Sequence, residues 1–208
     1  MSRKEEITDI ITEKIIAGLI SEGIFNHVFP GCVVGYGNDK HFKVIKEGKF
    51  TYGSDSSKVD ATTIYDIASL TKIVTTTGIL VLNTEQQLSL DDPIDKYLNV
   101  SSFPTVTIRH ILAHTGGLTL SLSSLKDLSN KEIDATILNT GPTSKPGEKI
   151  YYSNQGFYIL GKVIESITGQ TLAHFFQKSI FDPLEMTDTQ SNPPALLKNR
   201  IAPTENDE

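Results

Sequence analysis

The chain has 208 residues, which is enough for one large domain or two small ones with a substantial hydrophobic core. Its formal net charge of −6 at pH 7 argues against nucleic acid or an anionic membrane as the main partner, because both attract basic surfaces. The single cysteine, Cys32, excludes an internal disulfide and a zinc site built from cysteines.

Residues 1–23, "MSRKEEITDIITEKIIAGLISEG", predict an amphipathic helix that ends at Gly23. The apolar residues spaced for one face of this helix are Ile7, Ile10, Ile11, Ile15 and Leu19. Charged residues interrupt the apolar run, so the segment matches neither a secretory signal nor a bilayer span. We therefore expect a cytoplasmic chain without a membrane span.

Two β-rich stretches follow, "GCVVGYG" and "HFKVIKEGKFTYG", and the short polar stretch "NDK" separates them. β-Branched and aromatic residues on both sides of a polar turn predict an antiparallel hairpin. Two strands alone do not make a stable sheet, so the hairpin needs cover from the first helix or further strands.

From about residue 61 the pattern changes to helices separated by turns. We expect helices over residues 68–86, within "TVTIRHILAH", within "NQGFYILGKVIESITG" and within "LAHFFQKSIF". The predicted caps and stops are Thr107, Gly116 with Gly117, Gly169 and Thr171.

These patterns divide the chain into three regions. Residues 1–60 form a helix and a hairpin, residues 61–190 form a mostly helical region that carries the candidate motifs, and residues 191–208 form a polar, proline-rich tail. We interpret the tail as a point of truncation.

The stretch "YDIASLTKIVTTTGILVL" places Lys72 three residues after Ser69, at the start of an apolar helix. Side chains three apart share a helix face, and the field at a helix start favours an oxyanion. A lysine in this setting can take the proton of the serine. The alternative is a lysine that reaches water from a core helix. The second Ser-x-x-Lys pair, Ser123 and Lys126, has polar neighbours and is expected in a solvated loop or short helix.

The pattern Tyr-x-Asn occurs three times, as Tyr36 with Asn38, Tyr97 with Asn99, and Tyr152 with Asn154. Only Tyr152 and Asn154 stand between a turn, "KPGEK", and an apolar helix, where a scaffold presents loop side chains. A lysine ammonium nearby would lower the pKa of the Tyr152 phenol and make it an acid or base. Asn154 is predicted to contact a substrate amide, to cap the following helix, or both.

His110 and His114 are four residues apart on one helical face, a spacing found in metal sites. The glutamate of the zinc-hydrolase motif is missing and no third ligand is evident. We interpret both histidines as packing or capping residues and expect neither a metal nor another cofactor.

Four segments together resemble the serine β-lactamase-like superfamily: "ASLTK", "IRHILAHTGGL", "PGEKIYYSNQGFYILGKVIE" and "FDPLEMTDT". The most similar group contains class C β-lactamases, D-alanyl-D-alanine carboxypeptidases and related serine esterases, and the resemblance runs from about residue 20 onward. It implies an α+β fold with an antiparallel sheet flanked by helices, here incomplete, and a mostly helical subdomain.

The resemblance also implies roles for the motif residues. Ser69 would be the acylated nucleophile, Lys72 its partner, Tyr152 the general base that later protonates the leaving group, and Asn154 a contact to the substrate amide. The implied activity is hydrolysis through an acyl-enzyme of an amide or ester, such as a β-lactam, a D-alanyl peptide or a small ester.

Members of this superfamily carry a third motif, Lys or His, any residue, then Gly, on a late strand that supplies an oxyanion amide. No such strand follows Tyr152, so the resemblance implies the first part of such an enzyme, truncated or naturally short. Two alternatives stay open. One is a scaffold that binds a ligand or partner without turnover, and the other is a homo-oligomer in which a second copy completes the sheet edge.

Overall fold

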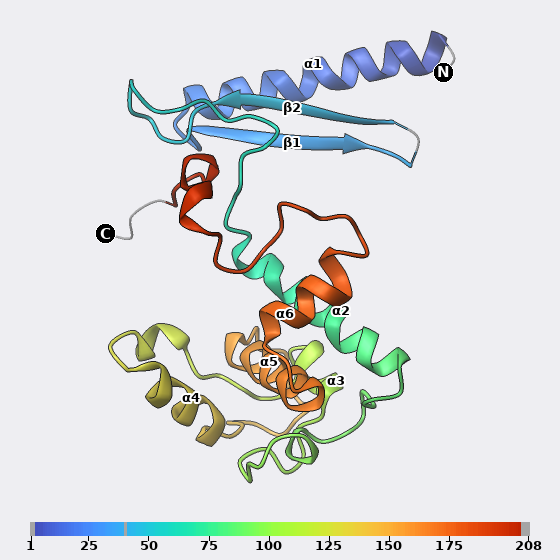
Figure 1. Cartoon of the computed structure of the whole chain (residues 1–208), viewed down its shortest axis with the longest axis vertical. Helices are drawn as coiled ribbons and strands as arrows, with labels where there is room; N and C mark the ends of the chain where they lie inside the picture. Colours follow the sequence, from blue (N-terminus) through green and yellow to red (C-terminus); the bar gives the residue numbers. More distant parts are fainter. Residues whose placement is uncertain (1–2, 40, 205–208) are drawn as a thin grey trace. The chain divides into compact units, whose positions relative to one another are not determined.

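The computed structural model describes residues 3–39 and 41–204, with side chains from Ile10 onward. The chain forms two compact units, one made of Met1–Asp66 with Asn192–Glu208 and the other of Ile67–Ser191. The chain contains helices as well as an antiparallel pair of strands, so the fold is α+β (Figure 1).

The first unit contains the predicted hairpin. Strand β1 (Gly31–Gly37) pairs antiparallel with β2 (Phe42–Gly48), in a register that places Val34 opposite Ile45. Helix α1 (Arg3–Phe25) lies along this hairpin (Figure 1). The described part of the chain therefore confirms the hairpin and gives it the helical cover that two strands require.

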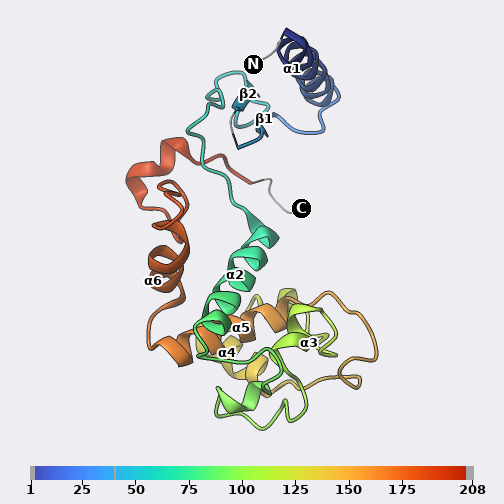
Figure 2. The ribbon, with the colours of Figure 1, turned by 90° about the vertical axis from the view of Figure 1, so that its right-hand side faces the viewer.

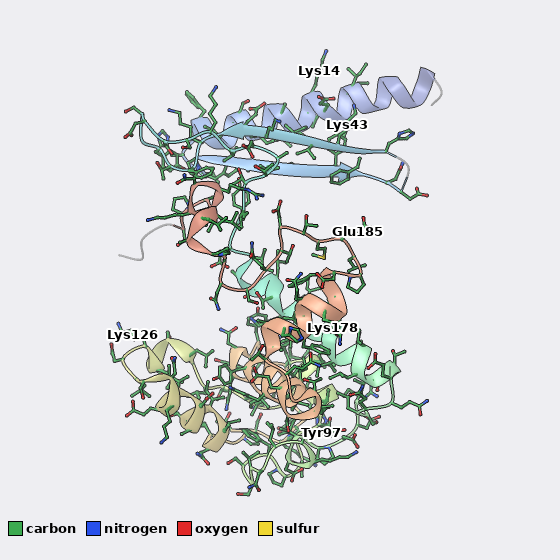
Figure 3. The ribbon with its side chains drawn as sticks, viewed as in Figure 1. Lys14, Lys43, Tyr97, Lys126, Lys178 and Glu185 are labelled. Atoms are coloured by element: carbon green, nitrogen blue, oxygen red, sulfur yellow. The ribbon has the colours of Figure 1, made fainter. Side chains whose placement is uncertain are left out.

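The apolar face predicted for α1 does not face the hairpin. Four of its residues are exposed: Ile10, Ile11, Ile15 and Leu19. The side chain of Ile7 lies outside the described residues. The helix buries Ile20 instead, and polar contacts also join it to β2, since Lys43 (labelled in Figure 3) pairs with Glu13 at 3.1 Å. Ser21 likewise donates a hydrogen bond to Glu47 at 2.9 Å.

Gly23 does not end α1, which continues to Phe25. A Cβ atom at Gly23 would lie 2.6 Å from Cζ of Phe29, so the glycine makes room for this close ring contact. The chain leaves the helix at His27, whose φ of 55° is left-handed. The prediction failed because a glycine that makes room for a neighbour looks the same in sequence as a terminator.

The described part of the carboxyl-terminal segment, residues 192–204, packs within this first unit. A 3₁₀ helix, η5 (Ala195–Arg200), precedes a parallel bridge between Ile64 and Ile201. The N–H of Ile64 donates to the Arg200 carbonyl at 2.7 Å, and the N–H of Ala202 donates to the Ile64 carbonyl at 2.9 Å.

The second unit is helical and holds the main core. Its helices are α2 (Thr71–Thr84), α3 (Ile108–Leu112), α4 (Asn130–Asn139), α5 (Asn154–Thr168) and α6 (Leu172–Phe176), with 3₁₀ turns at η1 (Ala68–Leu70), η2 (Ile94–Lys96) and η3 (Leu122–Leu125) and a π turn at η4 (Gln177–Phe181). Helix α5 is central, because it contacts α2, α3, α4 and α6 (Figure 2). Its predicted apolar face supplies Leu160, Val163 and Ile164, all fully buried.

Local signals define the ends of these helices. Thr107 and Thr171 cap α3 and α6 as predicted, since each side chain accepts a backbone N–H from the first turn. Gly169 ends α5 in the left-handed conformation, with φ of 66°, which confirms its predicted role. No helix within the described part of the chain is long and apolar enough to cross a membrane.

Candidate active site

Ser69 lies in η1, the turn that leads into α2, and its side chain is exposed. The residue before it, Ala68, has φ of 42°, a left-handed conformation that costs an alanine about 1–2 kcal/mol. Strained backbone of this kind persists only where the surrounding structure holds it, and it is concentrated at functional sites. The turn thus presents the Ser69 hydroxyl in a fixed position at the head of a helix.

Lys72 lies one turn further and contacts this hydroxyl. Its Nζ donates a hydrogen bond to Ser69 Oγ at 3.2 Å. The side chain is half-buried, and Nζ lies 4.7 Å from the centre of the Tyr152 ring and 5.8 Å from that of Phe157. Both aromatic faces attract the ammonium, which offsets part of the cost of its burial. Lys72 is therefore held at Ser69 rather than extended into water.

Tyr152 lies in the segment before α5. Its side chain completes a cluster with those of Ser69 and Lys72. Hydrogen bonds from Lys72 and Ser69, together with the charge of Lys72, lower the pKa of its phenol below the ordinary value of 10. The sequence predicted a lowered pKa for this phenol from a neighbouring lysine, because hydrogen-bond donors and a positive charge both stabilise the phenolate. The residue remains 56% exposed, so the cluster lies at the surface of the second unit.

Asn154 is the first residue of α5 and its side chain is exposed. It does not cap the helix as predicted. The cap is Ser153, whose Oγ accepts the N–H of Gly156 at 3.0 Å and whose backbone has the extended conformation of an N-cap. The prediction placed the helix start one residue too late, which leaves a substrate contact as the remaining proposed role of Asn154.

His114 joins the cluster, although the sequence indicated only packing or capping. Its Nδ1 accepts the N–H of Ser153 at 3.0 Å, and its carbonyl accepts the N–H of Tyr151 at 2.8 Å. Its ring stacks on that of Tyr152, with centres 4.6 Å apart and planes at 29°. Burial and the charge of Lys72 lower the pKa of His114 below its ordinary value of 6.5.

The left-handed conformation of His114, with φ of 57°, also corrects the predicted end of α3. The helix ends at Leu112, before Gly116 and Gly117. A non-glycine residue in this conformation is uncommon, and the hydrogen bonds of His114 to the segment before α5 account for it. The signal in the sequence was a histidine at a helix end, but nothing local showed that it faces Tyr152.

The other motif matches have local structural roles. Ser123 lies in η3, as predicted for a solvated short helix, and its Oγ is 2.7 Å from that of Ser121. Lys126 follows this turn and is exposed (Figure 3). The hydroxyl of Tyr97 donates to the Asp92 carboxylate, and Tyr36 lies within β1.

His110 closes a capping box at the start of α3, as the capping interpretation predicts. Its Nδ1 accepts the N–H of Thr107 at 3.2 Å, while the Thr107 hydroxyl accepts the N–H of His110. Among the side chains that the structure describes, in residues 10–39 and 41–204, no group of three or more His, Cys, Asp or Glu is arranged to hold a metal.

Comparison with known proteins identifies the family and several relatives of this chain. Residues 16–208 match the family model described as "Beta-lactamase". The chain is 31% identical over 187 residues to penicillin-binding protein 4* of Bacillus subtilis (strain 168), which covers 84% of this chain and 41% of the relative. It is 33% identical over 163 residues to the protein flp of Staphylococcus aureus (strain MRSA252), which covers 72% of this chain and 33% of that protein. The chain thus spans less than half the length of these relatives.

Solved structures share the fold. A class C β-lactamase aligns with a TM-score of 0.82 and 22% identity, over 91% of this chain and 54% of the other. The octameric penicillin-binding protein homologue of Pyrococcus abyssi aligns with a TM-score of 0.75 and 25% identity, over 91% and 47%.

Fold and matches together define a protein of the serine β-lactamase and penicillin-binding-protein superfamily. Within it, the chain belongs to the Beta-lactamase family, whose model matches most of its length.

Proposed function

We propose that Ser69 is the nucleophile of a serine hydrolase that acts on an amide or ester through an acyl-enzyme. The observation that carries the proposal is the contact of 3.2 Å between Lys72 Nζ and Ser69 Oγ, beside a tyrosine with a lowered phenol pKa. A nucleophile with an activated base within hydrogen-bond reach is the general requirement for covalent catalysis.

In the acylation step, Ser69 Oγ attacks the substrate carbonyl and forms the new C–O bond. Its proton passes to the Tyr152 phenolate, which the Lys72 ammonium stabilises. The bond to the leaving nitrogen or oxygen then breaks, and the leaving group takes the proton from Tyr152. Tyr152 thus serves as base and then as acid, and it ends the step as the phenolate in which it began.

In the second step, water attacks the acyl carbonyl and gives its proton to the same phenolate. The bond between the acyl carbon and Ser69 Oγ breaks, and the proton returns from Tyr152 to Ser69. No step in this sequence requires an electron donor, an acceptor or a further reactant apart from water.

The proposed substrates are β-lactams, D-alanyl peptides and small esters. The relative from Bacillus subtilis is named a penicillin-binding protein, which supports a β-lactam or a peptide of that shape. The exposed side chain of Asn154, two residues from Tyr152, is our proposed contact for the substrate amide.

Burst kinetics test the proposal. A p-nitrophenyl ester should release about one equivalent of p-nitrophenolate quickly, followed by slower turnover, and Ser69→Ala should abolish the burst. A burst without turnover would favour the scaffold that binds covalently and does not hydrolyse. No burst from a folded chain would contradict the proposal.

We also propose that the chain self-associates. The octameric homologue of Pyrococcus abyssi supports this, and so does the two-stranded sheet of the first unit, since sheet edges favour pairing between chains. Light scattering across a concentration series should show a mass above that of the monomer. A monomer at all concentrations would contradict this second proposal.

A further inference from the structure

We infer that His114 is a positioning residue that holds Tyr152 at Ser69 only while its imidazole is neutral. This inference rests on the proposed function, because it assigns a regulator to the same site. Protonation of His114 would release Tyr152 and so add a second loss of acylation in acid, beyond the loss of the Tyr152 phenolate.

His114 contacts both the backbone on either side of Tyr152 and the ring of Tyr152 itself. It binds the backbone on both sides of that residue, through its carbonyl to Tyr151 N–H at 2.8 Å and through Nδ1 to Ser153 N–H at 3.0 Å. Its ring also stacks on the Tyr152 ring at 4.6 Å. One side chain and its own carbonyl therefore fix the position of the phenol.

The hydrogen bond to Ser153 determines the protonation state. Because Nδ1 accepts an N–H, the neutral ring carries its proton on Nε2. A second proton would go on Nδ1, which would then be a donor facing the donor N–H of Ser153, and this bond would break. Of the two hydrogen bonds that flank Tyr152, only the one from Tyr151 N–H to the His114 carbonyl would remain. The strained left-handed backbone at His114 would then be held by fewer contacts.

The groups that face His114 favour the neutral ring. From α2 comes the positive charge of Lys72, from the segment before α5 the titratable ring of Tyr152, and from α5 the apolar ring of Phe157 at 5.2 Å. Burial and the Lys72 charge lower the pKa of His114, so the ring is neutral at pH 7 and becomes charged below its ordinary value of 6.5. The site should therefore be intact at neutral pH and lose its order in acid.

One test needs no activity. In an NMR titration of the wild-type chain, the backbone amide of Ser153 and the ring signals of Tyr152 should shift together with the His114 ring, at one midpoint below pH 6.5. If His114 titrates while the Ser153 amide and Tyr152 stay unchanged, the inference is wrong. This result stands whether or not the chain acylates, so it is separable from failure of the proposed function.

The second test is His114→Asn. Asparagine accepts left-handed backbone readily, and its Oδ1 can take the place of Nδ1 as acceptor, but it does not titrate. Acylation by a p-nitrophenyl ester at pH 7.5 should stay within about threefold of wild type, whereas His114→Ala, which loses the acceptor, should be slower by about tenfold to a hundredfold. The phenolate fraction of Tyr152 falls with pH in every variant, so the test is the additional, steeper decline of the wild type between about pH 6.5 and 5, which should disappear in His114→Asn only.

The matched control is His110→Gln, four residues earlier, because glutamine at this position also closes a capping box. It should keep the wild-type pH profile. An additional acid decline that is as steep in His114→Asn as in the wild type would overturn the inference.

Discussion

At the scale of single residues, the site depends on how Lys72 is held. It hydrogen-bonds Ser69 and lies over two aromatic rings, so its charge is fixed beside both the proposed nucleophile and the proposed base. Its ammonium also lowers the pKa of Tyr152, which keeps part of the phenol ionised at a pH where a free tyrosine would be neutral.

This link between Lys72 and Tyr152 predicts a shift in pH dependence. Acylation should rise with pH as the phenol ionises and level off below pH 10, because its pKa is lowered from that value. In Lys72→Met the donor and the charge are lost, so the profile should move toward pH 10 and the rate at pH 7.5 should fall about a hundredfold or more.

Rates of p-nitrophenyl ester acylation from pH 6 to 10.5 measure this shift. Lys126→Met, in the second Ser-x-x-Lys pair, is the control and should match wild type because Lys126 is exposed and follows a separate turn. An unshifted profile in Lys72→Met would show that Lys72 does not control the ionisation of Tyr152.

At the scale of the elements, Gln155 ties the start of α5 to its neighbours. This fully buried side chain accepts the N–H of Leu120 at 3.3 Å and donates to the carbonyls of Ile137 at 3.3 Å and Thr140 at 2.6 Å. Three residues after Tyr152, it thereby joins α5 to the end of α4 and to the chain before η3.

Gln155→Leu should therefore lower the free energy of unfolding by about 2 kcal/mol or more, because it leaves one buried and two part-buried backbone groups unpaired and a buried one costs about 1–3 kcal/mol. Urea unfolding measures this loss. Gln170→Leu is the control, since the buried Oε1 of Gln170 has no hydrogen-bond partner in the described part of the chain. Equal losses in both variants would mean that the hydrogen bonds of Gln155 contribute nothing specific.

The Asp92 carboxylate stabilises the turn before η2, and this stabilisation depends on its ionisation. It accepts hydrogen bonds from Lys96 Nζ at 2.8 Å, from the Tyr97 hydroxyl and from Ser89 N–H at 2.8 Å, which lower its pKa from 3.8 to about 2. Because the folded pKa is the lower one, ionised Asp92 adds stability that is complete above pH 3.8 and is lost as the pH falls through about 2.

Asp92→Asn should thus be less stable than wild type at pH 6, and the difference should shrink as the pH falls from about 4 toward 2. Thermal unfolding of both chains across this range is the measurement. A difference that stays constant down to pH 2 would exclude the carboxylate as its source.

Most elements follow from local sequence patterns. Alternating and β-branched residues predicted the hairpin, and Thr107, Thr171 and Gly169 marked helix ends correctly. Helix α4 was not predicted, although Ser129 and Glu132 form the capping box that marks its start. That signal was present in the sequence, since a serine followed three residues later by a glutamate is the pattern of this box.

The site was predictable only in part. The spacing of Ser69 and Lys72 brings them together within one turn, so sequence alone indicated their contact. His114 and Ser153 are 39 residues apart, and their hydrogen bond depends on how α3 packs against α5. Such long-range contacts leave no periodic pattern, which is why His114 was interpreted as a packing or capping residue.

At the scale of the whole molecule, the two units differ in how much they bury. Among the described residues, the buried apolar side chains of the first unit are Ile20, Ile45 and Val59, whereas the main core cluster lies in Ile67–Ser191. Local stability follows buried apolar contact, so the second unit should be the more stable one.

Amide hydrogen exchange read by mass spectrometry tests this difference. Peptides from α5 should exchange slowest, and peptides from α1 and the β1–β2 hairpin should exchange at least about tenfold faster. Similar protection in the hairpin and α5 would contradict the division of stability.

The central claim is that Ser69 becomes covalently acylated, and intact mass is its most direct test. The chain is incubated with benzylpenicillin and, separately, with a p-nitrophenyl ester, and the adduct is located by peptide mapping. We predict one acyl group on Ser69, absent in Ser69→Ala and retained in Ser123→Ala. A folded wild-type chain with no adduct, or an adduct that persists in Ser69→Ala, would contradict the account.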